Sequence, residues 1–238
     1  MLLLPGIGFL FIIALAVVPA AVLMRYIYKQ DRIEKEPVGL LMRLILLGVI
    51  AGFLSMLLES LGQFLLGLTK VDPSSPVYTI LMAFFVVAAV EEGTKYFLMH
   101  KKVWKNPAFD YRFDAIVYAV FTSLGFAAME NIMYVMGFGL SVVLARALLS
   151  IPAHMSFSVV FGVFYGRARR CANTGQKQAC RLNILLGYLT AVFFHGFYDS
   201  CAMIGTTFSM ILFALFMIVI YATIFFVVRS EARTDRPV

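Results

Sequence analysis

The chain has 238 residues, of which 62% are hydrophobic and 14% are charged. A soluble domain is usually nearer half apolar and a quarter charged, so this composition excludes an ordinary soluble domain and predicts an all-α polytopic membrane protein. The net charge of +7 could suggest a nucleic-acid binder, but 17 of the 20 basic residues lie in connections at alternate ends of the apolar stretches. This positive-inside pattern predicts no nucleic-acid partner, an N-terminus outside and a cytoplasmic C-terminus.

Charged residues and helix breakers divide the chain into seven apolar stretches, each long enough to cross about 30 Å of hydrocarbon as a helix. We expect these transmembrane helices at residues 2–28, 38–68, 77–99, 113–137, 141–165, 182–203 and 206–228. The connections between them are too short for a soluble domain, so we expect residues 1–238 to form a single integral membrane domain. The first stretch is interpreted as a retained anchor, because it is too long for a signal peptide and basic residues follow it.

The second stretch contains Gly48 and Gly52, whose spacing predicts close approach to another helix. Near its outer end, Glu59 and Gln63 lie one helical turn apart. Two interpretations of this polar pair stay open, an interfacial patch near water and a contact with a substrate or site.

The third stretch carries Glu91-Glu92-Gly-Thr-Lys95 inside an otherwise apolar run. Each carboxylate costs roughly a few kcal/mol in a bilayer, so the pair indicates function. The spacing of four residues predicts that Glu91 pairs with Lys95 on one helix face. Glu92 points about 100° around the helix, so it must find its partner on another helix or stay protonated.

The next three stretches carry polar groups that a lipid-facing helix would not keep. They are Asp114, Glu130 and Asn131 in the fourth stretch, His154 in the fifth, and His195 and Asp199 in the sixth. Asp114 could simply complement a helix dipole, whereas Asp199 can fix the tautomer of His195 one turn away. At about 1.5 Å per residue from the cytoplasmic edge, Glu91 lies at about 12 Å and the other groups beyond Asp114 at about 18–25 Å, all within the bilayer.

Carboxylates and imidazoles at similar depth can activate a water molecule, directly or at a metal ion, and aim it at a carbonyl group. Imidazole can serve as a metal ligand or polarise the carbonyl oxygen. The sequence lacks His-Glu-x-x-His, Gly-x-Ser-x-Gly and phosphate-binding motifs. Two other classes stay open, a proton-coupled transporter or channel and a non-catalytic membrane scaffold, although the sequence shows no internal repeat of the kind common in transporters.

These motifs resemble those of the PrsW family of intramembrane proteases, from the third stretch to the sixth. The matching blocks are Glu91-Glu92-Gly-Thr-Lys95, Phe113-Asp114-Ala-Ile-Val-Tyr118, Gly125-Phe-Ala-Ala-Met-Glu130-Asn131-Ile-Met-Tyr134, His154 and His195-Gly-Phe-Tyr-Asp199. The family is distantly similar to the type II CAAX prenyl endopeptidases, which also use a Glu-Glu motif followed by histidine motifs. One departure is Ala115, where the family often has glycine.

The resemblance implies five catalytic residues, which are Glu91, Glu92, Glu130, His154 and His195. Residues in supporting roles would be Lys95, Asp114 and Asn131. The family is classed among metalloproteases, so Zn²⁺ is a candidate cofactor, with His154, His195 and Asp199 as candidate ligands. A metal-free, glutamate-dependent mechanism stays open, as does the choice between Glu91 and Glu92 as the base.

The resemblance also implies a substrate and a location. Characterised members of the family cleave a membrane-anchored anti-sigma factor. The expected partners are therefore such a membrane-anchored protein and the lipid bilayer, in a bacterial plasma membrane.

Overall fold

A computed structural model describes residues 5–238, which are helical apart from loops and one isolated β-bridge between Tyr111 and Pro237. Seven helical segments in this range are long and apolar enough to cross a membrane, which confirms the predicted all-α polytopic class. The beginning of the first expected span, residues 2–4, lies outside the described residues.

The segments follow one another along the chain with short connections. They are α1 (Pro5–Gln30), α2 (Val38–Gly67), α3 (Pro76–Leu81), η1 (Met82–Ala88), α4 (Ala89–Val103), α5 (Asp114–Phe138), η2 (Leu140–Val142), α6 (Val143–Ala145), η3 (Arg146–Ser150), α7 (Ile151–Asn173), α8 (Lys177–Ile204) and α9 (Thr207–Arg233). The η1 and η3 segments are π-helical and η2 is a 3₁₀ turn. The third membrane helix therefore consists of α3, η1 and α4. The sequence did not predict that a π-helical segment would interrupt it.

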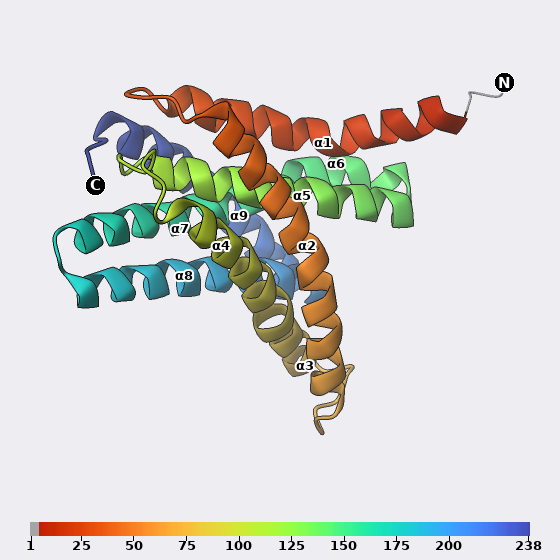
Figure 1. The fold of residues 1–238 in the computed structure, drawn as a ribbon. Helices are drawn as coiled ribbons and strands as arrows, with labels where there is room; N and C mark the ends of the chain where they lie inside the picture. The colour runs from red at the N-terminus through yellow and green to blue at the C-terminus, as the bar shows by residue number, and fades with distance from the viewer. Residues whose placement is uncertain (1–4) are drawn as a thin grey trace.

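Helix α5 is the centre of the bundle. It packs against α1, α2 and α7, and residues 114–129 are buried without a break. Within its apolar window 83% of the residues are buried, against at most 56% for any other described span. In Figure 1, α2 and the α3–η1–α4 segment run side by side and cross the remaining helices at a steep angle. The other helices are thus arranged around α5. We call α2 and the α3–η1–α4 segment the tilted pair.

Glycines let α2 pack directly on α5. A Cβ atom at Gly48 would collide with the backbone carbonyl oxygen of Thr122, and one at Gly125 with that of Ile45. Backbone contact of this kind is possible only where neither helix carries a side chain at the crossing. The predicted close approach at Gly48 is confirmed, and it fixes the distance between α2 and the bundle.

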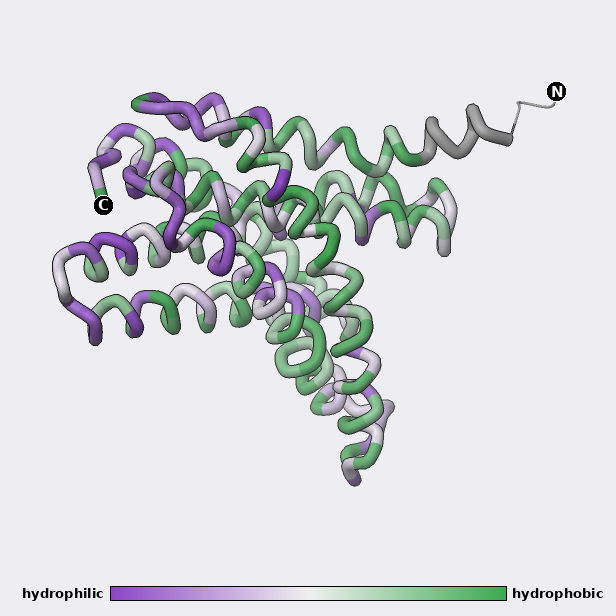
Figure 2. Tube along the Cα trace, viewed as in Figure 1, coloured by the Kyte–Doolittle hydropathy of each residue, from purple (hydrophilic) through white to green (hydrophobic). Residues whose placement is uncertain are grey.

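Hydrophilic residues gather at one end of the bundle, as Figure 2 shows by colour. This basic end contains the connections 31–37 and 104–113, the turn 174–176 and the C-terminal residues 234–238. The Asp235 carboxylate accepts a 2.9 Å hydrogen bond from the backbone N–H of Phe113 at the start of α5. Arg112 and Glu231 form an ion pair of 3.4 Å, so the tail ties α9 to α5.

Candidate active site

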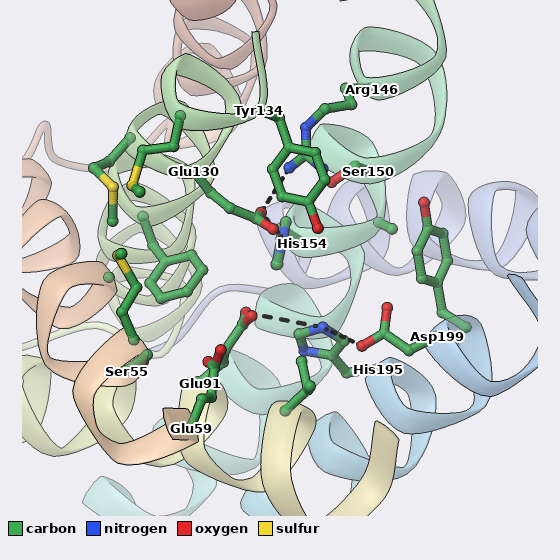
Figure 3. Close-up of a pocket in the computed structure, with 18 of the residues that line it drawn as sticks. Ser55, Glu59, Glu91, Glu130, Tyr134, Arg146, Ser150, His154, His195 and Asp199 are labelled. Carbon is green, nitrogen blue, oxygen red and sulfur yellow. Dashed lines mark hydrogen bonds and ion pairs between the residues drawn. The ribbon is translucent and has the colours of Figure 1, made fainter. Parts of the chain in front are cut away.

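A cavity of about 500 Å³ lies between the tilted pair and the rest of the bundle, with α2 on one side and α5, α7 and α8 on the others. Figure 3 shows the side chains that point into it, among which five were singled out from the sequence. They are Glu91 from α4, Glu130 from α5, His154 from α7, and His195 and Asp199 from α8. Groups separated by more than 100 residues are thereby brought to one place.

Local packing sets the positions of these side chains. Gly196 lets α8 approach η1 closely, because a Cβ atom there would lie 2.6 Å from Cδ1 of Phe84. His195 is the adjacent residue, so this approach brings its ring to the helix that carries the Glu-Glu motif. On the other side, the hydroxyl groups of Ser55 on α2 and Thr94 on α4 lie 2.6 Å apart in a buried hydrogen bond. The π-helical η1 ends three residues before Glu91, and such segments often occur at functional sites.

Lys95 pairs more closely with Glu92 than with Glu91. Its Nζ atom lies 2.6 Å from Oε1 of Glu92 and 3.7 Å from Oε2 of Glu91. The expected pair of Glu91 and Lys95 is present, but Glu92, which was expected to find its partner on another helix or stay protonated, is the closer partner of Lys95. Glu92, three residues before Lys95, reaches the ammonium more closely than Glu91 does. Glu92 is also held by a second partner. That partner is His195 on another helix, as the predicted direction of Glu92 requires.

Both ring nitrogens of His195 face carboxylates. Its Nδ1 atom lies 2.8 Å from Oε1 of Glu92, and its Nε2 atom lies 3.2 Å from Oδ2 of Asp199 and 3.8 Å from Oε2 of Glu91. The ring is buried and stacks on Phe157, with ring centroids 5.2 Å apart. His195 is therefore fixed in orientation between α4 and its own helix.

His154 is held by a second group of charges. Its Nε2 atom lies 3.1 Å from Oε2 of Glu130, and the same oxygen accepts a 2.7 Å hydrogen bond from Arg146. Arg146 also donates to Asn131 at 2.9 Å, and its guanidinium lies 3.8 Å from the ring centre of Tyr134. Arg146 was not among the residues selected from the sequence. The available signal was its charge within the apolar stretch that follows Gly139, which is a reason to suspect function.

Asp114 and Glu59 are two residues for which the sequence left more than one interpretation open. Asp114 is at the basic end, where its Oδ2 accepts hydrogen bonds from the backbone N–H groups of Asp110 and Tyr111. It does not line the cavity. Glu59 and Gln63 do line it, on the α2 wall, which favours the site contact over the interfacial patch.

Four residues offer a donor set suited to a metal ion. One ligand atom each from Glu91, Glu92, His154 and His195 can be chosen so that all lie within 4.8 Å of one another, and all four residues are buried. Asp199 is not part of this group. The Oε2 atoms of Glu91 and Glu92 are buried without a hydrogen-bond partner, so each has a lone pair available. Two carboxylates and two imidazoles are ligands that Zn²⁺ and other divalent transition metals accept, so the donor set fits such an ion.

Comparison with known proteins gives this arrangement a family. Residues 36–228 match the family described as PrsW family intramembrane metalloprotease. The chain belongs to the PrsW family. The protease PrsW of Geobacillus kaustophilus is 34% identical over 188 residues, which cover 79% of this chain and 78% of that protein. The protease PrsW of Bacillus subtilis is 32% identical over 188 residues, covering 79% and 81% of the two chains.

A third relative extends the match along the chain. The protease PrsW of Clostridioides difficile is 30% identical over 211 residues, 87% of this chain and 85% of that protein. No solved structure matches the chain. Family membership confirms the resemblance and shows an intramembrane protease that crosses a bacterial membrane several times. It decides against the transporter and the non-catalytic scaffold.

Proposed function

We propose that this PrsW protease hydrolyses a peptide bond of a membrane-anchored protein, with a water molecule that Glu91 activates. The observation that supports Glu91 over Glu92 is the exposure of each to the cavity. Glu91 lines the cavity, and its Oε2 atom has no hydrogen-bond partner, as is also true of Oε2 of Glu92. Glu92 has no exposed surface and is bonded through Oε1 to Lys95 and His195. A base must reach the water whose proton it takes, and Glu91 meets that requirement.

Glu91 accepts a proton from water as the water oxygen attacks the carbonyl carbon of the substrate. His195 faces the cavity with Nδ1 on Glu92 and Nε2 on Asp199, so its Nε2–H would have to exchange Asp199 for the carbonyl oxygen as negative charge develops there. The C–N bond then breaks, and Glu91 returns its proton to the leaving amine. The products are a carboxylic acid and an amine, so one water molecule is consumed and the residues are regenerated.

The remaining groups orient this machinery. Glu130 bonds Nε2 of His154, which leaves Nδ1 directed toward Lys95 at 3.4 Å. A divalent cation held by Glu91, Glu92, His154 and His195 would act as a Lewis acid toward the water or the carbonyl oxygen. Glu91, Glu130, His154 and His195 are thus assigned to the site, with Asp199 beside His195 and Glu92 anchoring it.

The substrate class is a membrane-anchored protein such as an anti-sigma factor, and its release would regulate transcription. The chain forms one integral membrane domain with its N-terminus outside and its C-terminus in the cytoplasm. The basic residues at the end that carries 31–37, 104–113 and 174–176 support this orientation.

The test is cleavage by the purified full-length protein in liposomes, with single-span substrates that include anti-sigma factors. We expect the wild type to release a new product and Glu91→Gln to lower kcat by about 10²–10⁴, the usual contribution of a general base. The matched control is Glu34→Gln, the same chemical change at an exposed position in the connection 31–37, which should keep full activity. Unchanged turnover by Glu91→Gln would refute this mechanism.

A further inference from the structure

The Lys95 ammonium lies among the atoms that would bind a metal ion. Its Nζ atom is 2.6 Å from Oε1 of Glu92, 3.7 Å from Oε2 of Glu91 and 3.4 Å from Nδ1 of His154. Three of the four residues in the metal-donor set therefore face the same ammonium group. An ion pair that served packing alone would need one carboxylate, whereas here two carboxylates and an imidazole converge on one cation.

Nothing in the surroundings separates this charge from the donors. The Lys95 side chain has no exposed surface, and its Nζ lies 4.5 Å from the ring centre of Phe126. Bulk water therefore cannot screen the ammonium, and the aromatic face itself favours a cation at that position.

A metal ion in the same cluster would come close to this charge. Zn²⁺ binds carboxylate oxygen at about 2 Å, so an ion on Oε1 of Glu92 would lie at most about 5 Å from Nζ of Lys95. Two positive charges at that distance in a buried site repel each other strongly. Glu92 could keep its bond to Lys95 only if the metal used its other oxygen, Oε2, which has no hydrogen-bond partner.

We propose that Lys95 is a built-in cation of the active site and competes with a divalent metal ion for Glu91, Glu92 and His154. The ammonium supplies the positive charge that a metal would otherwise bring to the two carboxylates. The inference concerns the metal-donor set of the proposed site and does not depend on peptide hydrolysis.

The test is Zn²⁺ affinity, measured on metal-free full-length protein in detergent by competition with a fluorescent chelator. Cys171, Cys180 and Cys201 are replaced by serine in every variant, so that thiols do not bind the ion. We expect Lys95→Met to bind Zn²⁺ at least about tenfold more tightly than the parent, because neighbours of a metal site commonly change its affinity by 10–100-fold. Added Zn²⁺ should also raise the melting temperature of Lys95→Met more than that of the parent.

Three further variants make the result specific. Lys101→Met removes another ammonium of α4, one that stacks on Phe97 outside the cluster, and should leave Zn²⁺ affinity unchanged. His154→Asn added to Lys95→Met should abolish the gain. Lys95→Gln replaces Lys95→Met if the latter does not purify as a single species, because its amide can still donate to Glu92.

Two results would overturn the inference. Equal Zn²⁺ affinity with and without the Lys95 ammonium, including no binding by either protein, contradicts the competition. A gain that persists after His154→Asn places the ion elsewhere. Because the titration contains no substrate, its outcome is independent of the cleavage assay that tests the proposed hydrolysis.

Discussion

The guanidinium of Arg146 and the carboxylate of Glu130 form an ion pair of 2.7 Å at the wall of the cavity. The same carboxylate oxygen contacts Nε2 of His154, so the pair fixes the ring that faces Lys95. Two charge-assisted bonds to one carboxylate oxygen restrict its position. The pair joins η3, which leads directly into α7, to α5 at the centre of the bundle.

We expect Arg146→Gln to lower kcat by about 10–100-fold, as loss of an orienting partner commonly does. Arg146→Lys keeps the charge but loses the second bond to Asn131, so it should restore part of the activity. Arg181→Gln, at an exposed position, is the control. The measurement is kcat and KM in liposomes, and an unchanged kcat for Arg146→Gln would show that Glu130 needs no such partner.

Glu92 and Lys95 should behave as a structural unit. Glu92→Gln leaves the fully buried Lys95 without its nearest counter-charge, and breaking such a pair costs about 3–5 kcal/mol. We therefore expect poorer yield and a lower melting temperature for Glu92→Gln than for Glu91→Gln. The double change Glu92→Gln with Lys95→Met should restore the melting temperature without restoring cleavage. Equal melting temperatures for the two single variants would contradict the assignment of roles.

The crossing of α2 and α5 should tolerate no added methyl group at Gly48. Gly48→Ala forces the two backbones apart, and overpacking of this kind costs about 1–3 kcal/mol. Gly39→Ala is the matched control on the same helix, because a Cβ atom at Gly39 meets nothing within 4 Å. Thermal unfolding followed by size-exclusion chromatography should show a lower midpoint for Gly48→Ala alone.

The connection 31–37 predicts a dependence of stability on pH. Burial raises the pKa of Glu36 from 4.5 to about 7, although the hydroxyl group of Tyr118 donates to it at 2.7 Å. The folded state therefore keeps the proton to higher pH than the unfolded state does. The contribution of Glu36 to the free energy of unfolding is therefore fully present below pH 4.5. It is lost as the pH rises through about 7.

Glu36→Gln should flatten this dependence between pH 5 and pH 8, measured as the shift of the unfolding midpoint. Part of the slope should remain, because burial also raises the pKa of Asp31, to about 6. Asp114 and Asp110 are the other carboxylates near Glu36. The exposed neighbour Glu34 provides the control, and a Glu34→Gln protein should keep the full slope.

Orientation can be tested by cysteine labelling of intact cells, in a protein whose three native cysteines are replaced. A cysteine at position 72 should react with a membrane-impermeant reagent, and cysteines at positions 102 and 170 should not. Labelling at 102 would reverse the proposed orientation.

The sequence predicted the class of fold because a bilayer requires apolar helices and basic connections whatever the tertiary packing is. It also selected Glu91, Glu130, His154, His195 and Asp199, which the structure brings to one cavity, because polar groups in apolar helices are few. The sequence could not predict the π-helical η1, since an i→i+5 pattern arises from packing and not from local propensity.

Pairing at the Glu-Glu motif shows the limit of helical spacing as a guide. The spacing of four residues favours Glu91 for Lys95, but His195 on another helix holds Glu92 so that its oxygen is closer. For Asp114, the sequence position was a good guide. Its place at the start of the helix already set it apart from the deeper groups, and only the family resemblance grouped it with them.

The cavity lies between helices and not on a loop, and this limits the form in which a substrate can react. A peptide bond that arrives in a transmembrane helix already has its carbonyl oxygen bonded to an N–H group four residues further along. A substrate that reacts from such a helix must therefore uncoil before its carbonyl carbon is open to attack, and in lipid each lost backbone bond is costly. Segments with glycine or proline uncoil at lower cost, so we expect this protease to select its cleavage sites by the ease of local unwinding.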